Sequence, residues 1–357
     1  MLNMLWTAEY DPQWEEILKK NFNLKRAGFN IHNLSGQFFT EDELIENLQG
    51  IDVFLVGYDP ITEKVLDACP DLKVILTVRD GPEENIDTKA CEARGIPVMN
   101  SAGRCAVSVA ELTWGLIMNM ARPMITIANR IRQDRWTKEN KQELRNIVEA
   151  RAFELGGKTL GIVGMGRNGQ SIARMASGFN MEILGYDPYQ SQEAMDKLNV
   201  KLVSLEDLMK NSDYVVVMAR VTEESKGLIS KEMISLMKKT ACIVNTARAP
   251  LVDYDALIEA LKNDKIRMAA IDVFKPQPIG PESPWYDLPE DKVIITNHMA
   301  GFSNERTAHQ CEIAFDSFND WVNGVVPARL YTKNVFDSQD FANKGGKLWD
   351  SKYELKK

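Results

Sequence analysis

The residues best suited to chemistry lie in the second half of the chain, each after a short apolar run. Arg248 follows ACIVNTA, and His298 follows VIITN. A guanidinium can bind a carboxylate through two parallel hydrogen bonds, and an imidazole exchanges protons near neutral pH. Because ligands of doubly wound parallel sheets bind at the carboxyl ends of strands, these side chains are candidates for clamping a carboxylate and for transferring a proton. The alternative for Arg248 is a surface ion pair, and the alternative for His298 is a purely structural role.

A glycine-rich turn predicts a second kind of site. Gly164, Gly166 and Gly169 form the pattern GMGRNG, which follows a strand-like run and opens the helix-like QSIARMA. Backbone N–H groups at such a turn bind the pyrophosphate of a dinucleotide. Asp187 ends the next apolar run, where a carboxylate accepts from the ribose hydroxyls of NAD and repels the 2′-phosphate of NADP. The pattern predicts NAD as the cofactor, the alternative being a glycine turn that only serves strand–helix packing.

A parallel sheet flanked by helices is needed to position these residues. Apolar runs alternate with helical patterns from end to end, which is typical of an α/β protein. We expect helices at about 107–122 and 303–324, and a solvated helix or arm over the charged residues 130–146. The expected strands are VFLVGYDP, KVILTV, IPVMNS, TLGIVG, LGYD, YVVVMA, ACIVNT, MAAIDVF and VIITNH.

Composition limits the class of protein. A chain of 357 residues favours two domains, and its 44% hydrophobic and 26% charged fractions are those of a soluble globular protein. The net charge of −8 argues against a nucleic-acid partner held by phosphate contacts. No apolar run of membrane-spanning length is free of charge, and no basic leader precedes the acidic N-terminus, so we expect a cytoplasmic protein without a membrane partner. Five scattered cysteines predict reduced thiols and no metal site.

Three further segments carry a family resemblance. NTARAPLVDYDAL, MAAIDVFKPQP and TNHMAGFS, spaced behind GMGRNG, resemble the NAD-dependent D-isomer-specific 2-hydroxyacid dehydrogenases, the phosphoglycerate dehydrogenase-like family. The resemblance runs from about residue 50 to residue 325. It implies two Rossmann-like, doubly wound parallel-sheet domains with a cleft between them. Residues 1–104 and 300–330 would form a discontinuous substrate-binding domain, residues 105–299 the NAD-binding domain, and residues 331–357 a C-terminal tail.

The resemblance also implies roles for single residues. Arg248 would orient a 2-oxo acid, and His298 would be the acid/base of hydride transfer between NAD(H) and a D-2-hydroxy acid. Main-chain groups of Arg79, Asp80 and Gly81 would hold the substrate carboxylate. A homodimer would form through the NAD domains, with the helix that begins near Val107 at the interface. The residues that match NAD-contacting positions are Arg167, Asn168, Asp187, Thr246 and Asp272.

One position departs from the family pattern. The family's third catalytic residue is a Glu five residues after the Asp of DVF, and in this chain that position is Gln277. A carboxylate partner raises the pKa of a histidine, whereas a neutral amide orients the ring without supplying charge. We therefore expect His298 to titrate near the ordinary value of about 6.5. The alternative is that Glu282, further along the loop, takes the place of the missing carboxylate.

Gln277 leaves two other functions open. NAD-dependent formate dehydrogenases carry a Gln in the same PQP setting, so formate oxidation by the Gln277/His298 pair is one alternative; against it, those enzymes have an Asn where this chain has Cys105. The other alternative is a non-catalytic NAD(H)-sensing protein. His32 and His309 receive no role.

The loop TVRDGPEENID also departs from the family pattern, because it replaces a glycine-rich segment. In this loop Arg79 is a candidate for recognising a second anionic or polyhydroxy end of the substrate. Pairing with Asp80 or Glu83 is the alternative.

Overall fold

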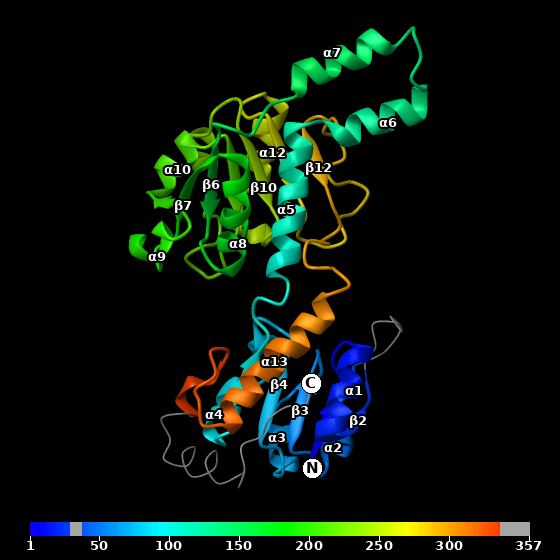
Figure 1. The fold of residues 1–357 in the computed structure, drawn as a ribbon, viewed down its shortest axis with the longest axis vertical. Helices are drawn as coiled ribbons and strands as arrows, with labels where there is room; N and C mark the ends of the chain where they lie inside the picture. Colours follow the sequence, from blue (N-terminus) through cyan, green and yellow to red (C-terminus); the bar gives the residue numbers. More distant parts are fainter. Residues whose placement is uncertain (29–37, 336–357) are drawn as a thin grey trace. The chain divides into compact units, whose positions relative to one another are not determined.

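The computed structural model describes residues 1–28 and 38–335. The chain divides into two compact units, Met1–Cys105 with the chain from Ser303, and Ala106–Phe302. Each contains a fully parallel sheet flanked by helices (Figure 1), which confirms the predicted fold class. The cleft expected between the units stays a prediction. His32 and residues 336–357 of the predicted tail lie outside the described residues.

The first unit is built on a five-stranded sheet of order β2-β1-β3-β4-β5. Its strands are β1 (Leu2–Trp6), β2 (Phe22–Arg26), β3 (Val53–Val56), β4 (Val74–Thr77) and β5 (Val98–Asn100). Its helices are α1 (Pro12–Asn21), α2 (Glu41–Leu48), α3 (Glu63–Ala68), α4 (Thr88–Ala93) and α13 (Arg306–Val322), with short 3₁₀ turns η1 (Pro82–Glu84) and η4 (Lys333–Val335). The first two strands were not predicted.

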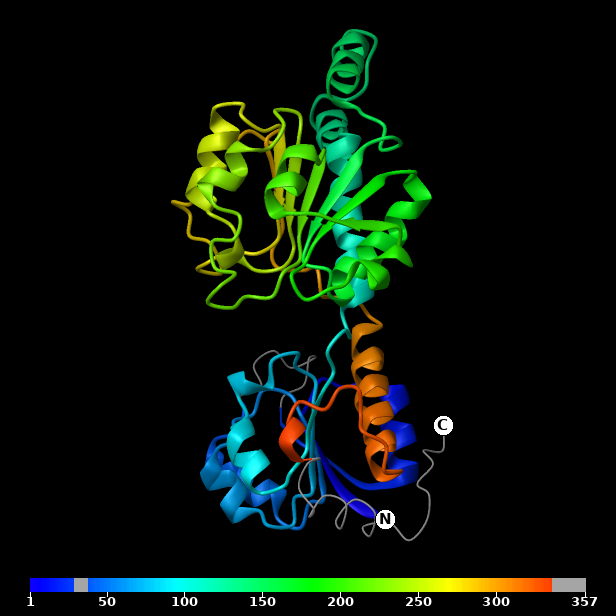
Figure 2. The ribbon, with the colours of Figure 1, turned by 90° about the vertical axis from the view of Figure 1, so that its left-hand side faces the viewer.

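The last long helix completes the core of the N-terminal sheet. Helix α13 lies beside α1 (Figures 1 and 2), and Phe315 stacks on Trp14 with ring centroids 5.3 Å apart. Phe318 meets Phe22 edge-on at 5.6 Å, and both rings are fully buried. Aromatic residues contribute the largest apolar area per side chain, so segments from the two ends of the sequence share one core.

The second unit is built on a seven-stranded sheet of order β12-β11-β10-β9-β6-β7-β8. Its strands are β6 (Thr159–Val163), β7 (Glu182–Tyr186), β8 (Val200–Leu202), β9 (Tyr214–Val217), β10 (Cys242–Asn245), β11 (Met268–Ile271) and β12 (Val293–Ile295). Its helices are α5 (Ala106–Ala121), α6 (Met124–Asp134), α7 (Lys141–Arg151), α8 (Arg167–Ala176), α9 (Gln192–Asp196), α10 (Leu205–Asn211), α11 (Lys231–Ser235) and α12 (Tyr254–Lys262), with 3₁₀ turns η2 (Ser177–Phe179) and η3 (Ala249–Leu251). Strand order reverses between β6 and β9, which is where such sheets bind dinucleotides.

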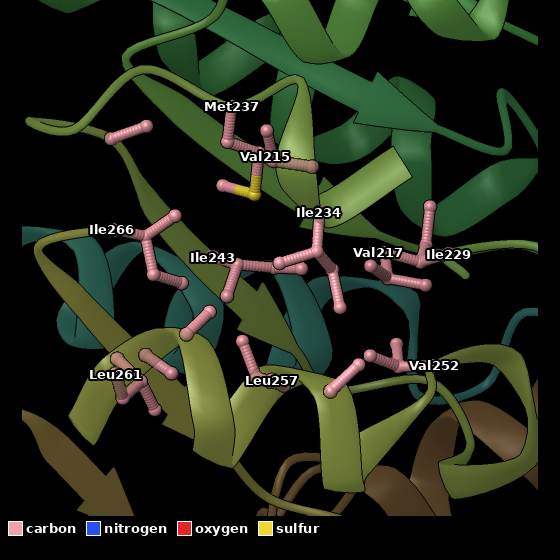
Figure 3. Packing of buried hydrophobic residues seen from close by; sticks show 14 of the residues in the cluster. Val215, Val217, Ile229, Ile234, Met237, Ile243, Val252, Leu257, Leu261 and Ile266 are labelled. Atoms are coloured by element: carbon pink, nitrogen blue, oxygen red, sulfur yellow. The ribbon is translucent and has the colours of Figure 1, made fainter. Parts of the chain in front are cut away.

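Continuous apolar strands give this unit its core. Val215 and Val217 of β9, with Ile243 of β10, pack toward Leu257 and Leu261 of α12 (Figure 3). All five side chains are fully buried. Parallel strands covered by helices on both faces need such uninterrupted apolar runs, which explains why the sequence pattern predicts them well.

Helices α6 and α7 form an arm that projects away from the sheet of the second unit (Figure 1). Arg130 of α6 donates to Glu143 of α7 at 2.6 Å, which joins the two helices. At the base of the arm Arg267 donates to the carbonyl oxygens of Met120 and Arg151 at 2.7 and 2.8 Å. The predicted solvated segment is therefore two helices, anchored at one end.

Three structural findings relate to the predictions on thiols, membranes and metal ions. All five cysteines are free, as their spacing predicted. No helix within residues 1–28 and 38–335 is long and apolar enough to cross a membrane. The same residues contain no group of His, Cys, Asp and Glu side chains arranged to hold a metal ion.

Candidate active site

The turn after β6 is shaped by its three glycines. Gly164 has a positive φ of 100°, and a Cβ there would lie 2.5 Å from the backbone nitrogen of Ala219. A Cβ at Gly169 would lie 2.1 Å from the carbonyl oxygen of Gly164, so both positions require glycine for packing. A Cβ at Gly166 would meet no atom of the described chain within 4 Å. Gly166 therefore leaves an open backbone surface of the kind a pyrophosphate needs.

Helix α8 begins immediately after this turn. No side chain in the described part of the protein caps its N-terminus at Gly166, where Arg167 and Asn168 form the first turn. Uncapped first-turn N–H groups and the helix dipole favour an anion at this end. Asp187, at the end of β7, accepts from the backbone N–H of Met165 at 2.8 Å through Oδ2. Each carboxylate oxygen has more than one acceptor site, so Asp187 can also bind ribose hydroxyls, and these residues fit NAD.

A buried carboxylate supports the loop that contains His298. His298 has a positive φ of 59°, an uncommon backbone conformation for a residue with a side chain. Asp272 is fully buried, and its Oδ1 accepts from the N–H of Met299 at 2.9 Å and from the Thr296 hydroxyl at 2.5 Å. Its Oδ2 accepts from the N–H of Ala300 at 3.0 Å. The Asp272 side chain, predicted to contact NAD, thus holds the His298 loop in place.

His298 is paired with an amide. Its Nδ1 lies 2.8 Å from Oε1 of Gln277. When that oxygen accepts, Nδ1 is the protonated nitrogen and Nε2 is left to exchange a proton with a substrate. Burial lowers the pKa of His298, and the positive charge of Arg248 lowers it further, while Asp272 partly opposes both. The pKa of His298 is therefore not raised, as expected without a carboxylate partner, but lies below the ordinary value because desolvation and a nearby cation act on the ring.

A polar chain joins the loop of Arg248 to the loop of Gln277. The buried side chain of Asn245 donates to the carbonyl of Arg248 and to the hydroxyl of Tyr254, both at 3.0 Å. That hydroxyl donates in turn to the carbonyl of Val273 at 2.7 Å. Burial raises the pKa of Tyr254, so the phenol keeps its proton. Asn245 and Tyr254 occur within NTARAPLVDYDAL, but no sequence signal marked them as support for the site.

Arg248 itself has an exposed side chain. Its Nη1 donates to the neighbouring carbonyl of Ala247 at 2.7 Å. Thr246, two residues before it, is buried, and its hydroxyl lies 2.7 Å from the hydroxyl of Thr113 on α5. The Thr246 hydroxyl, predicted to contact NAD, is therefore engaged within the second unit, whereas the Arg248 guanidinium is accessible.

The substrate-carboxylate loop predicted at Arg79, Asp80 and Gly81 follows β4 in the first unit. The Arg79 side chain forms an ion pair with Glu84. Its guanidinium also lies 4.7 Å above the ring of Tyr58. The structure thus gives Arg79 an acidic partner, Glu84, that the sequence did not suggest.

Comparisons with known proteins agree with this arrangement. Residues 114–300 match the family model of the NAD-binding domain of D-isomer-specific 2-hydroxyacid dehydrogenases. A glyoxylate reductase of Korarchaeum cryptofilum (strain OPF8) is 33% identical over 293 residues, which cover 82% of this chain and 86% of that protein.

Two further comparisons differ in how much they cover. A D-3-phosphoglycerate dehydrogenase of Methanocaldococcus jannaschii is 37% identical over 268 residues, 74% of this chain but 49% of that protein, so the match spans about half its length. The apo structure of Rhodotorula graminis D-mandelate dehydrogenase has a TM-score of 0.76 at 24% identity, covering 92% of this chain and 97% of that one. This last likeness concerns the fold alone.

Proposed function

The chain belongs to the D-isomer-specific 2-hydroxyacid dehydrogenases, and from this premise we propose which of its side chains carry the reaction. It is an NAD-dependent oxidoreductase that interconverts 2-oxo acids and D-2-hydroxy acids. NAD(H), when bound, supplies or takes up the hydride. The observation that carries the proposal is the 2.8 Å contact between His298 and Gln277, at the carboxyl end of the strands that also present Arg248.

His298 is the acid and base of the reaction. In reduction its imidazolium releases the Nε2 proton to the carbonyl oxygen of the 2-oxo acid, and in oxidation the neutral ring takes that proton back. Gln277 orients the ring through Nδ1 but supplies no charge to stabilise the imidazolium. Burial and the charge of Arg248 lower the pKa of His298 and so disfavour the protonated form needed for reduction.

Arg248 binds and polarises the substrate. Its exposed guanidinium can donate to the 2-oxo acid and stabilise the negative charge that develops on the carbonyl oxygen. The hydrogen bond from Asn245 to its carbonyl holds the backbone from which this side chain extends. The main chain of Arg79, Asp80 and Gly81, in the substrate-binding domain, holds the substrate carboxylate.

The cofactor is held by the second unit. The glycine turn and the first-turn N–H groups of Arg167 and Asn168 bind the pyrophosphate, and Asp187 binds the ribose. The loops that contain Thr246 and Asp272 face the nicotinamide end of the cofactor. The backbone of these loops contacts the nicotinamide, and the two side chains hold that backbone in place through their hydrogen bonds.

A second copy of the chain covers part of the second unit. Large apolar side chains are exposed along α5 and the arm, namely Val107, Met124, Ile125, Trp136 and Phe153. Trp136 is 68% exposed at the tip, between α6 and α7. Val107 lies at the start of α5, and the other four lie on the arm or at its base. Exposed apolar groups on these elements favour an interface, so we propose a homodimer through this unit. Five free cysteines are consistent with a reducing compartment, and we propose the cytoplasm.

The test is NADH consumption against a panel of 2-oxo acids, with formate plus NAD in parallel. Turnover on at least one 2-oxo acid is expected, together with a drop of about a hundredfold or more in kcat for His298→Asn. Arg248→Lys, which keeps the charge but loses the two-pronged geometry, is expected to raise KM and lower kcat. Turnover of formate alone would favour the formate alternative, and NADH binding with no turnover would favour a sensor.

A further inference from the structure

The loop that contains Gln277 leaves the sheet of the second unit a few residues before that amide. Strand β11 ends one residue before Asp272, whose N–H donates to the carbonyl of Asn245 at 3.0 Å and so extends the pairing with β10. One residue later, the carbonyl of Val273 accepts from the hydroxyl of Tyr254 at 2.7 Å. A side chain from α12 therefore holds the chain at the point where it leaves the strand.

Tyr254 is itself fixed by its surroundings. It is the first residue of α12, and its ring meets that of Trp285 edge-on with ring centroids 5.0 Å apart. Phe274 packs edge-on against the same Trp285 at 5.9 Å, and all three rings belong to the core of the unit or border it. The Tyr254 hydroxyl accepts from Nδ2 of Asn245 at 3.0 Å while it donates to Val273. Packing thus fixes the ring, and two hydrogen bonds fix its polar tip.

Gln277 depends on this anchoring because little else holds its side chain. The residue is exposed, and within the described part of the chain its side chain forms a hydrogen bond only with Nδ1 of His298, at 2.8 Å. Phe274 and Ile279, on either side of it in the sequence, pack against the core of the unit. The prolines that flank Gln277 restrict the backbone between these two contacts. The position of the amide therefore follows from where Phe274 is held.

Arg248 has a separate link to Asn245. Nδ2 of Asn245 also donates to the carbonyl of Arg248 at 3.0 Å, and Oδ1 accepts from the N–H of Ala247 at 3.1 Å. These two hydrogen bonds do not pass through Tyr254. Loss of the Tyr254 hydroxyl alone should release the loop of Gln277 and leave the backbone of Arg248 in place.

We propose that Tyr254 is a positioning residue for the proton transfer, because its hydroxyl fixes the loop that holds Gln277 against His298. The inference rests on the proposed function, in which His298 exchanges the proton with the substrate. Gln277 keeps the proton of the ring on Nδ1 and leaves Nε2 to the substrate. Tyr254 acts on this arrangement through the carbonyl of Val273 and takes no part in the chemistry itself.

The test begins with Tyr254→Phe, which keeps the ring and its packing and removes only the hydroxyl. We expect kcat for 2-oxo acid reduction to fall by about tenfold, because the imidazole of His298 loses its orientation. KM should change by less than about threefold, since Arg248 stays anchored. The pKa of His298, followed by NMR of its imidazole, should fall below the wild-type value. The imidazolium loses its hydrogen bond to Gln277, whereas the charges of Arg248 and Asp272 remain.

A double-mutant cycle shows whether the effect passes through Gln277. In a Gln277→Ala background the loop no longer presents an amide to His298, so adding Tyr254→Phe should lower kcat further by less than about threefold. Equal losses in the two backgrounds would show that the hydroxyl of Tyr254 does not act through Gln277, and would overturn the inference.

Tyr214→Phe is the matched control. Tyr214 is buried at the start of β9, in the same unit but at the end of the sheet opposite the site, and its hydroxyl forms a hydrogen bond with Arg267. Each variant loses one buried hydroxyl, so both melting temperatures should fall by a few degrees. Only Tyr254→Phe should change kcat and the pKa of His298.

Two results would overturn the inference while leaving the dehydrogenase activity intact. One is an unchanged kcat and His298 pKa in Tyr254→Phe, and the other is an equal change in Tyr214→Phe. Absence of wild-type turnover on every 2-oxo acid would instead contradict the proposed function. In that case the NMR titration of His298 would still show whether Tyr254 holds Gln277 against the ring.

Discussion

Nδ1 of His298 lies 2.8 Å from Oε1 of Gln277, so the proton-transferring ring is oriented by a neutral amide. The charges that act on the ring are those of Arg248, which lowers the pKa of His298, and Asp272, which raises it. Burial adds to the lowering. The pH dependence of the enzyme should therefore report on this small set of groups.

Replacing Gln277 by Glu should move the pH profile of reduction. The new carboxylate would stabilise the imidazolium and raise the pKa of His298, so the protonated ring would persist to higher pH. We expect the midpoint at which 2-oxo acid reduction declines, which in the wild type lies below about 6.5, to rise by about one to two pH units. Initial rates from pH 4.5 to 9 measure it, and an unchanged midpoint would show that Gln277 does not control the ring.

Replacing Asp272 by Asn should lower both the stability of the protein and the pKa of His298. An amide nitrogen would face one of the three donors that the carboxylate now accepts from, and we expect the free energy of unfolding to fall by about 2 kcal/mol or more. Loss of the negative charge should lower the pKa of His298 further, so reduction declines at still lower pH. Thermal unfolding and a pH profile test both effects.

Thr296→Val is the control for Asp272. It removes one donor to the carboxylate and keeps the charge, so stability should fall without a displaced pH midpoint. A displaced midpoint in Thr296→Val, equal to that of Asp272→Asn, would contradict a role for the Asp272 charge.

Two of the glycines in the turn after β6 should respond differently to alanine. Gly166→Ala meets open space, so the melting temperature should stay nearly unchanged while NADH affinity falls by about tenfold, because the new methyl lies where the pyrophosphate binds. Gly169→Ala would clash with the Gly164 carbonyl, and we expect it to destabilise the protein by about 3 kcal/mol. Fluorescence titration with NADH and thermal unfolding separate the two effects. Equal loss of stability in both variants would contradict this distinction.

The arm should control the oligomeric state. Trp136→Ser removes the most exposed large apolar side chain of the arm, and we expect the dimer to dissociate at about tenfold higher protein concentration or to be lost. Sedimentation analysis over a concentration series measures it. Tyr189→Ser is the control, because Tyr189 is 83% exposed in the same unit but outside the arm. A wild-type protein that stays monomeric throughout would contradict the proposed interface.

Most strands with continuous apolar runs were predictable from sequence, including the edge strands β5 and β12, whereas the polar edge strands β2 and β8 and the central strand β1 were not. β9 and β10 are continuous apolar runs, but β2 reads FNLKR and β8 reads VKL, because an edge strand needs little apolar surface. Their pattern therefore resembles that of loops.

Site residues were predictable where a residue type suited to binding or catalysis directly follows an apolar run. The glycine turn, Arg248 and His298 follow apolar runs, and the spacing from Asp272 identified Gln277. The supporting contacts were not predictable, because Asn245 and Tyr254 act through backbone carbonyls and nothing in the residue types indicates those partners. The lowered pKa of His298 escaped prediction for a similar reason, since burial follows from packing.

The interleaved composition of the first unit has a consequence for synthesis on the ribosome. The second unit is one uninterrupted stretch, Ala106–Phe302, and can fold as soon as it emerges. The N-terminal sheet, made first, must wait for Phe315, Phe318 and Trp321 of α13, which arrive after the whole second unit has been translated. Nascent chains therefore expose an unfinished apolar face for most of their elongation, and this is the stage at which chaperone protection would matter most.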